Sequence, residues 1–408
     1  MLAVGIGNAL EFFDFLTFSF FAVPIGHCFF PQTLTAHGLL YSLATFGVGF
    51  LTRPLGAVVI GIYGDRTGRK PAMVLSFTLM GAAILGLMLI PSYARIGIAA
   101  PILLVIFRLL QGFALGGEVG PTTAFLIEAV PPHRRGLYVS MQYMTQDVAV
   151  TAAGVVGFLL STWLSPTELD AWGWRMAFLI GLLIVPAGLY MRQHLPETIH
   201  EADRHAATPG QRRLPARLVV LALVLMMASS IYIYGVDYVT TYAQDSLHLS
   251  SAVAFGATVV VGIAAVLADP LSGLLSDRIG RKPVMLGAVA ILALLLVPAY
   301  RLMTTVRSIG VVYSVLALLG MLQAFLTAPA LIAVTESLPR AVRSGSLAIL
   351  YAVAISACGG TTQFAIKALT DLTGSALTPA WYMTGAVLAG GIAMALMRET
   401  APVAAIKS

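Results

Sequence analysis

Hydrophobic residues run through this chain in long blocks, each with about the 20 residues that an α-helix needs to cross the hydrocarbon core of a bilayer. The blocks follow one another from one end of the chain to the other, separated by short polar turns. Twelve can be placed, at approximately residues 3–27, 39–63, 71–91, 98–128, 136–163, 173–192, 216–243, 251–275, 283–303, 308–336, 345–369 and 380–398. The pattern predicts an all-α polytopic membrane protein with twelve transmembrane helices.

One polar stretch interrupts this pattern near the middle of the chain. It covers residues 193–215 and leaves six apolar segments on each side. We therefore expect an N-terminal six-helix bundle over residues 1–192, a cytoplasmic linker over 193–215 and a C-terminal six-helix bundle over 216–408. Two equally oriented sets of six helices predict parallel repeats that are related by an axis along the membrane normal.

Composition and charge agree with a membrane protein. Hydrophobic residues make up 58% of the 408 residues and charged residues 10%, against roughly 25% charged residues in soluble chains. Most of the 24 Lys and Arg residues fall in loops on one side of the predicted helices. Because cytoplasmic loops collect basic residues, both termini are predicted to be cytoplasmic in a bacterial-type inner membrane. This topology accounts for the net charge of +6 without a nucleic-acid partner.

Sequence signals of catalysis and cofactor binding are missing. The chain has no glycine loop followed by Lys-Ser or Lys-Thr for phosphate, no Cys-Xaa-Xaa-Cys, and no metal-ligand spacing among its seven histidines. We therefore expect neither an enzyme nor an ATP-driven pump, and no cofactor or metal.

Several charged side chains lie inside the predicted helices. An ionisable group at the bilayer centre costs at least about 2.5 to 3.5 kcal/mol, so each needs a partner, a water-filled cavity or a function. The rise of about 1.5 Å per residue places Arg53 and Asp147 near the midplane. Arg108 also reaches the central region, with Gln111 one turn further along its helix.

Four carboxyl groups are candidates for proton coupling. Glu11 and Asp14 are spaced i, i+3, so they share a helix face and their titrations can couple. One of them, or Glu118, is expected to take up a coupling proton, and Asp147 is a further candidate. The alternative is a static buried ion pair, for instance between Asp14 and Arg108, that holds helices together and never titrates.

The buried arginines are the candidates for binding an anionic solute. A guanidinium stays charged and holds a carboxylate with two hydrogen bonds, which favours Arg108 and Arg53. Lys367 could add a third positive charge, although a lysine near a helix end commonly reaches for the interface. Neutral donors are expected from amide and phenol side chains, with helix packing as the alternative role of the tyrosines. They are Gln111, Gln142, Gln146, Tyr232, Tyr234, Tyr238 and Gln323.

A repeated loop carries a family resemblance. The stretch from Gly61 to Pro71 returns from Gly273 to Pro283, each with the pattern Asp-Arg-Xaa-Gly-Arg-Lys-Pro. This loop resembles the signature loop of the major facilitator superfamily. The resemblance implies that the loop closes the cytoplasmic side of two pseudo-symmetric six-helix bundles, which assigns gating roles to residues of both copies. They are Asp65, Arg66, Arg69, Asp277, Arg278 and Arg281.

A narrower resemblance covers nearly the whole chain. The stretch from Gly7 to Phe15, Arg53 to Ala57 and Arg108 to Glu118 resemble the metabolite:proton symporter group, and residues 46–70 with the seventh helix look most like citrate and tricarballylate–proton symporters. The resemblance implies secondary active import of a small organic anion by proton symport with alternating access, by a protein that functions as a monomer. Sodium-coupled tricarboxylate uptake is an alternative.

Three carboxylates depart from the tricarboxylate pattern. Asp147 stands where that pattern has glutamine, Asp237 lies within the seventh helix and Asp269 precedes Pro270 in the eighth. Such groups repel a multiply charged anion unless they are protonated or paired, and they can instead be proton or cation sites. A dicarboxylate, a shikimate-like acid or a betaine- or proline-type zwitterion therefore remains an alternative solute. We expect the first half to carry most of the proton coupling and carboxylate recognition.

Overall fold

The computed structural model comprises the whole chain, and the structure describes residues 2–30, 35–67, 69–116, 123–124, 126–128, 130–183, 185–186 and 214–401. The backbone alone is described for residues 2–8, 11, 35–37, 64–66, 69, 70, 73 and 341. Every regular element in this part of the chain is helical, which confirms the predicted all-α fold.

The helices of the first half follow the apolar segments. They are α1 (Leu2–Phe20), α2 (Ala22–Phe29), α3 (Thr35–Val48), α4 (Arg53–Thr67), α5 (Arg69–Leu89), α6 (Tyr93–Ile96), α7 (Ala99–Leu115), α9 (Arg135–Trp163), α10 (Pro166–Glu168) and α11 (Trp174–Gly181). Two expected apolar segments are each broken into two helices, α1 with α2 and α3 with α4. Residues 187–213, with most of the expected linker, lie outside the described residues.

The second half is described without a gap up to residue 401. Its helices are α13 (Ala216–Asp237), α14 (Val239–Asp245), α15 (Ser251–Ile279), α16 (Arg281–Val306), α17 (Ile309–Ser337), α18 (Arg343–Ala354), α19 (Gly360–Thr373) and α20 (Thr378–Leu396), with a π-helical turn, Ile355–Gly359, between α18 and α19. Each expected segment of this half therefore has a helical counterpart.

Length and hydropathy agree with membrane crossing. Among the described residues, eight helical segments are long and apolar enough to span a bilayer. The pair Phe12–Phe20 and Ala22–Phe29, which bends by 68° at its break, makes a ninth if its two helices count as one span. Val74–Leu89 and Ala99–Leu115 are shorter apolar helices. Large apolar side chains such as Leu294 and Leu372 are exposed on the outside, as a lipid-facing surface requires.

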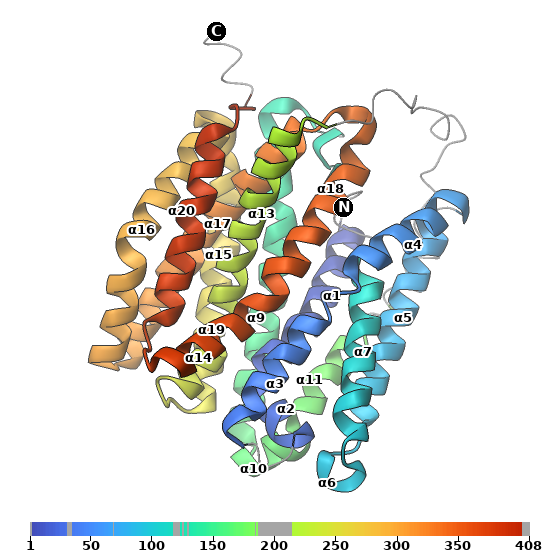
Figure 1. Cartoon of the computed structure of the whole chain (residues 1–408), viewed down its shortest axis with the longest axis vertical. Coiled ribbons are helices and arrows are strands. Elements are labelled where there is room, and N and C mark those ends of the chain that lie inside the picture. The colour runs from blue at the N-terminus through green and yellow to red at the C-terminus, as the bar shows by residue number, and fades with distance from the viewer. Residues whose placement is uncertain are drawn as a thin grey trace.

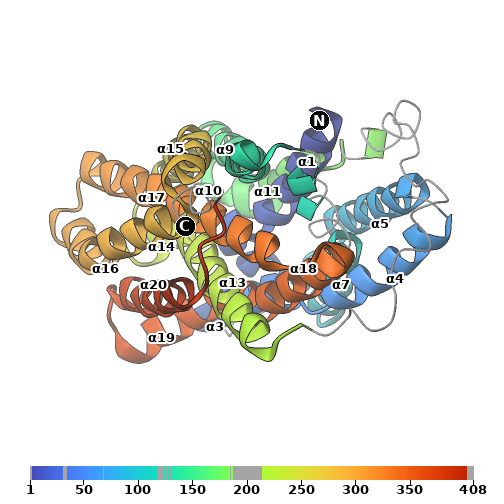
Figure 2. The same cartoon turned by 90° about the horizontal axis from the view of Figure 1, so that it is seen from above.

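The helices run roughly along the long axis of the molecule, as Figure 1 shows, with α4, α5 and α7 on one side and α16, α17 and α20 on the other. Seen from above in Figure 2, α9 of the first half lies beside α15 of the second. This α9–α15 contact is the most extensive between the halves, and α3 packs on α19 and α4 on α18. We call the α9–α15 contact the seam.

Small residues let the backbones approach closely along the seam. A Cβ atom on Gly262 of α15 would lie 2.9 Å from the backbone nitrogen of Thr151 in α9, and one on Gly154 of α9 would lie 3.0 Å from that of Val259. Toward one end of the seam, a Cβ on Gly273 would lie 2.5 Å from the carbonyl oxygen of Gly136. Inside a bilayer the lipid is as apolar as the helix surfaces, so the hydrophobic effect does not drive helices together. Their association depends on close packing of this kind.

Two helices of the second half are interrupted. The helix α13 ends at Asp237 and resumes as α14 after Tyr238, and α18 passes into the π-helical turn at Ile355. A break in a helix changes the direction of nearby side chains and leaves backbone N–H and C=O groups without intrahelical partners. π-Helical turns are common at functional sites. Both interruptions lie at the pocket described next.

Candidate functional site

Arg108, Gln111 and Asp14 form a hydrogen-bonded chain inside the first half. The Arg108 guanidinium donates to the Gln111 amide oxygen over 2.8 Å, and the Gln111 amide nitrogen donates to Asp14 Oδ2 over 2.7 Å. All three side chains are fully buried. The other carboxylate oxygen, Asp14 Oδ1, has no hydrogen-bond partner among the described residues. The arginine and the carboxylate thus communicate through an amide and not through a direct ion pair.

Aromatic rings compensate the two buried guanidinium groups. The Arg108 and Arg53 guanidinium carbons each lie 4.4 Å from the centre of the Phe15 ring. Phe18 lies under Arg108 at 4.4 Å and Phe50 under Arg53 at 4.3 Å. A desolvated cation–π contact contributes about 2 kcal/mol, so the rings offset part of the cost of burying these charges. We call Asp14, Arg53, Arg108 and Gln111 the arginine cluster.

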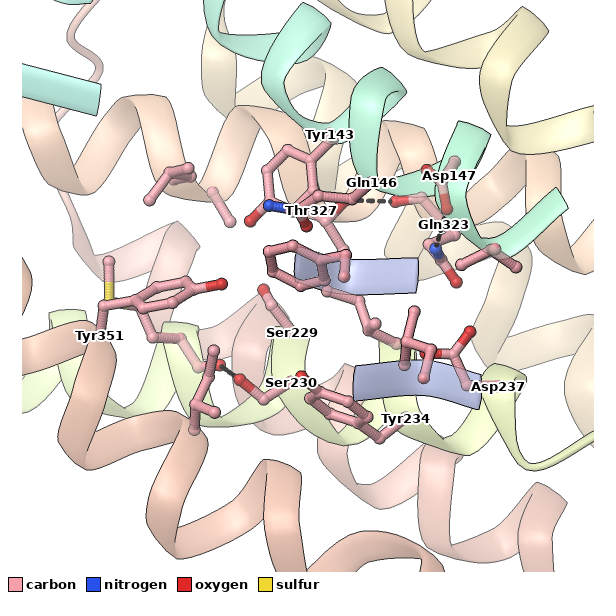
Figure 3. A pocket seen from close by; sticks show the side chains of 18 residues that line it. Tyr143, Gln146, Asp147, Ser229, Ser230, Tyr234, Asp237, Gln323, Thr327 and Tyr351 are labelled. Atoms are coloured by element: carbon pink, nitrogen blue, oxygen red, sulfur yellow. Dashed lines mark hydrogen bonds between the residues drawn. The ribbon is translucent and has the colours of Figure 1, made fainter. Parts of the chain in front are cut away.

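A pocket opens between the two halves beside this cluster. It encloses about 670 Å³ of empty space, including the part open to solvent, and is lined from α1, α9, α13, α17, α18 and the π-helical turn. Figure 3 shows its polar side chains. They are Tyr143, Gln146, Asp147, Ser229, Ser230, Tyr234, Asp237, Gln323, Thr327 and Tyr351.

The ionisable side chains in the wall of this pocket are acidic. Asp147 and Asp237 line it, and no Lys, Arg or His is among the described residues of its wall. Asp147 Oδ1 accepts a hydrogen bond of 3.4 Å from the Gln323 amide nitrogen, and the two side chains meet in Figure 3. Tyr234 belongs to the wall and also interacts with the Arg53 guanidinium. It therefore stands between the acidic pocket and the arginine cluster.

The structure brings together some of the residues predicted to bind the solute. Gln146, Tyr234 and Gln323 line the pocket, and Arg53, Arg108 and Gln111 lie in the arginine cluster. Four other candidates, Gln142, Tyr232, Tyr238 and Lys367, are absent from the wall.

These four side chains have other surroundings. The Gln142 amide oxygen accepts a hydrogen bond of 2.9 Å from Thr123, and the Tyr232 hydroxyl donates to the carbonyl oxygen of Leu319 over 3.0 Å. Tyr238 is buried. Lys367 forms ion pairs with Asp245 at 3.0 Å and Asp371 at 2.7 Å. Their part in solute binding stays a prediction.

The candidate proton carriers are described in part. Asp14 and Asp147 are buried, in the arginine cluster and the pocket wall respectively. The side chain of Glu11 and the whole of Glu118 lie outside the described residues, as do the side chains of Asp65, Arg66 and Arg69 in the first gating loop.

The second copy of the repeated loop joins the two halves where α15 ends and α9 begins. Asp277 accepts hydrogen bonds from the backbone nitrogens of Gly136 at 2.8 Å and Leu137 at 3.0 Å. A carboxylate at a helix N-terminus interacts favourably with the helix dipole, so Asp277 ties α15 to α9. Arg281 orients it through an ion pair of 2.7 Å, whereas Arg278 is exposed.

Two ion pairs support the same end of the interface. Arg135 of the first half lies 3.7 Å from Glu336, which also pairs with Arg281, and Arg343 of the second half lies 3.1 Å from Glu128. At the opposite end, Ser19 of α1 donates to Gln363 of α19 over 2.8 Å. The halves are therefore in polar contact on both sides of the pocket.

Comparison with known proteins identifies the fold family. The family model described as Major Facilitator Superfamily matches residues 8–361 and 218–407. This chain belongs to the major facilitator superfamily. It is thus a membrane transporter and not an enzyme, and it has the two-bundle helical architecture of that family.

Individual transporters of known name are also similar to this chain. The transporter is 36% identical to a citrate-proton symporter of Klebsiella pneumoniae, over 99% of this chain and 92% of the relative. It is 32% identical to a proline/betaine transporter of Escherichia coli strain K12, over 98% of this chain and 83% of the relative. A crystal structure of a D-xylose-proton symporter has the same fold, with a TM-score of 0.76 at 18% identity over 98% of this chain and 97% of that one.

Sequence reasoning missed part of the pocket wall of this transporter. Ser229, Ser230, Thr327, Tyr143 and Tyr351 carry no charge, so no insertion cost drew attention to them. The helix interruptions beside α13 and α18 left no distinct mark in the hydropathy pattern either. The carboxylates were found because each breaks an apolar segment, although their meeting in space was not foreseen.

Removal of the Asp277 carboxylate should loosen one end of the transporter. Asp277→Ala removes two hydrogen bonds to charged oxygen, each worth about 1.5 to 3 kcal/mol, so the buried position Ser140 should become more accessible. In a background without Cys28 and Cys358, we expect a water-soluble maleimide to label Ser140→Cys about tenfold faster or more. The matched change Arg278→Ala should leave the rate unaltered. Equal rates in all three proteins would show that Asp277 does not hold this contact.

Proposed function

We propose that this transporter imports a carboxylate-bearing metabolite together with protons, with citrate or a related tricarboxylate as the lead solute. The observation that carries this proposal is the chain Arg108–Gln111–Asp14, which joins a permanent cation to a titratable carboxyl. The name of the Klebsiella pneumoniae relative, a citrate-proton symporter, supports both the solute and the proton as coupling ion. We place both termini on the cytoplasmic side.

The hydrogen bonds that join Arg108, Gln111 and Asp14 make proton binding and anion binding interdependent. While Asp14 is ionised, its negative charge reaches Arg108 through the Gln111 dipole and compensates the guanidinium. A proton on Asp14 Oδ1, the oxygen with no partner among the described residues, removes that charge. Arg108 is then under-compensated and binds a carboxylate more strongly. A ligand that binds the protonated form better also raises proton affinity by the same factor, which is the thermodynamic basis of symport.

Access to Arg108 requires a rearrangement. In this structure the rings of Phe15, Phe18 and Phe46 lie within 4.4 to 5.3 Å of the guanidinium carbon. Phe12 and Leu16, on the same helix as Phe15, line the pocket. A shift of α1 that moves Phe15 aside opens the arginine cluster to the pocket. The solute then lies between the two halves, where alternating access by rocking can release it to the other side.

A zwitterion is the second candidate solute, and the acidic pocket wall favours it. Asp147 and Asp237 attract a positive group, and the rings of Phe12, Tyr143 and Tyr351 supply the aromatic faces that bind quaternary ammonium groups. The proline/betaine relative carries a name consistent with this solute. Both candidates share a carboxylate, which is the group assigned to the arginines.

Uptake into proteoliposomes tests the proposal. Under an inward proton gradient we expect labelled citrate to accumulate, and a protonophore to abolish the accumulation. Competition by tricarballylate, dicarboxylates, shikimate, proline and betaine ranks the solutes, and replacement of sodium by potassium should change nothing. If none of these solutes accumulates, the symporter proposal is wrong.

Arg108→Lys should weaken carboxylate binding. Lysine keeps the charge but loses the planar fork and the hydrogen bond to Gln111, so we expect the apparent affinity for the transported acid to fall about tenfold or more. The exposed Arg95 at the end of the molecule provides a matched control as Arg95→Lys. An unaltered apparent affinity in Arg108→Lys protein of normal folding would remove Arg108 from the solute site.

Asp14→Asn should uncouple solute transport from the proton gradient. The amide cannot take up a proton, so gradient-driven accumulation should be lost while exchange of labelled for unlabelled solute continues. Asp170→Asn, at an exposed carboxylate that pairs with His27, should retain both activities. Equal loss of accumulation and exchange in Asp14→Asn would count against a proton on Asp14.

A further inference from the structure

Two carboxyl groups from opposite halves meet at the seam. Asp147 belongs to α9 and Asp269 to α15, and they are 5% and 0% exposed. The two side chains lie within hydrogen-bond distance of each other. Neither oxygen of Asp269 has a donor in the part of the chain that the structure describes. The group that the buried Asp269 carboxyl faces is therefore the carboxyl of Asp147.

Such a pair requires a proton. Two carboxylates at hydrogen-bond distance in a desolvated site cannot both be ionised, and one shared proton turns their repulsion into a hydrogen bond. The amide of Gln323 donates to Asp147 over 3.4 Å, which does not replace a donor between the two acids. Within the described residues, no group of three or more His, Cys, Asp or Glu side chains is placed to hold a metal ion. A proton is the ligand that the geometry accommodates.

The surroundings supply no positive charge to take the proton's place. The titratable groups that face the pair are Tyr143 on α9 itself and, on α13, Asp237. Tyr234 of α13 and Tyr351 of α18 lie beyond Tyr143, and α17 contributes the neutral Gln323. No Lys, Arg or His of the described chain is among the groups acting on either carboxyl.

The pair lies where its charge acts on the contact between the halves. Along α9 it stands between Gly136 and Thr151, and along α15 between Gly262 and Gly273, positions where the two backbones are packed closely. Pro270 follows Asp269 inside α15 and removes one backbone hydrogen bond there, which makes this point of the helix easier to bend. Repulsion between two carboxylates at this point works directly against the seam.

We propose that Asp147 and Asp269 are a second proton-binding site, separate from Asp14, in which one shared proton holds the α9–α15 seam closed and its loss drives the halves apart. The proposal rests on the proposed function only in requiring that the two halves move. It needs no particular solute. It gives the transporter a proton site in each of two places, one within the first half and one between the halves.

Distance measurements between spin labels test this directly. Labels at the exposed positions His133, before α9, and Arg398, after α20, report on separation of the halves in lipid nanodiscs without solute, in a background lacking Cys28 and Cys358. We expect the distance distribution to shift to longer values as the pH is raised. Asp269→Asn and Asp147→Asn each place an amide donor between the partners, so each should abolish the shift and keep the short distance. Asp170→Asn, at an exposed carboxylate outside the seam, is the matched control and should retain the shift.

Several results would overturn the proposal. They are a distribution that does not change with pH in the parent protein, a shift that persists in both asparagine variants, or a shift that Asp170→Asn removes. If one asparagine variant does not fold, the other decides, and infrared spectra add a second measurement. The carbonyl band of a protonated carboxylic acid should be present in Asp14→Asn protein, and it should lose intensity when Asp147→Asn and Asp269→Asn are added to that protein. Because no solute is added, failure of the uptake assay would leave these results interpretable.

Discussion

Charge inside a membrane protein must be compensated where water cannot reach it, and this constraint shapes the centre of the molecule. Arg108 is fully buried, yet it forms no direct ion pair with Asp14. Aromatic rings from α1 and α3 lie against the guanidinium, and Gln111 relays its charge to the carboxylate. A direct ion pair would be static and costly to break in a low dielectric. The indirect arrangement leaves one carboxylate oxygen free of described partners, where a proton can bind.

The interior is divided electrically into two regions. The cationic side chains lie in the arginine cluster, and the carboxyl side chains of Asp147 and Asp237 lie in the pocket wall. Tyr234 touches both regions, so a solute that carries a carboxylate and a positive group would meet a complementary surface for each end. A multiply charged acid would need the acidic side chains to be protonated, which links its binding to the proton supply. The seam pair provides one place for such a proton.

The second copy of the repeated loop forms contacts between the halves. In the second copy, Asp277 binds the N-terminus of α9 and is held by Arg281, which also pairs with Glu336. Glu336 and Glu128 occupy matching places in the two repeats, and each forms an ion pair with an arginine of the opposite half. The two sequence repeats thus form equivalent ion pairs, each directed at the opposite half. These contacts lie at the end of the same seam that contains Asp147 and Asp269.

The class of fold follows from the hydropathy pattern alone, because a bilayer admits few structures and demands apolar segments of a set length. That pattern also located the buried charges, since each of Asp14, Arg53, Arg108 and Asp147 interrupts an apolar run at a measurable cost. Which of these charged side chains meet depends on how the helices pack. Asp147 and Asp269 are far apart in the chain, and their contact depends on glycines that let α9 and α15 approach closely. The aromatic rings against the arginines, the ion pairs of Lys367 and the uncharged residues of the pocket wall could not be predicted from periodicity either. Packing between helices places them, and hydropathy does not record that packing.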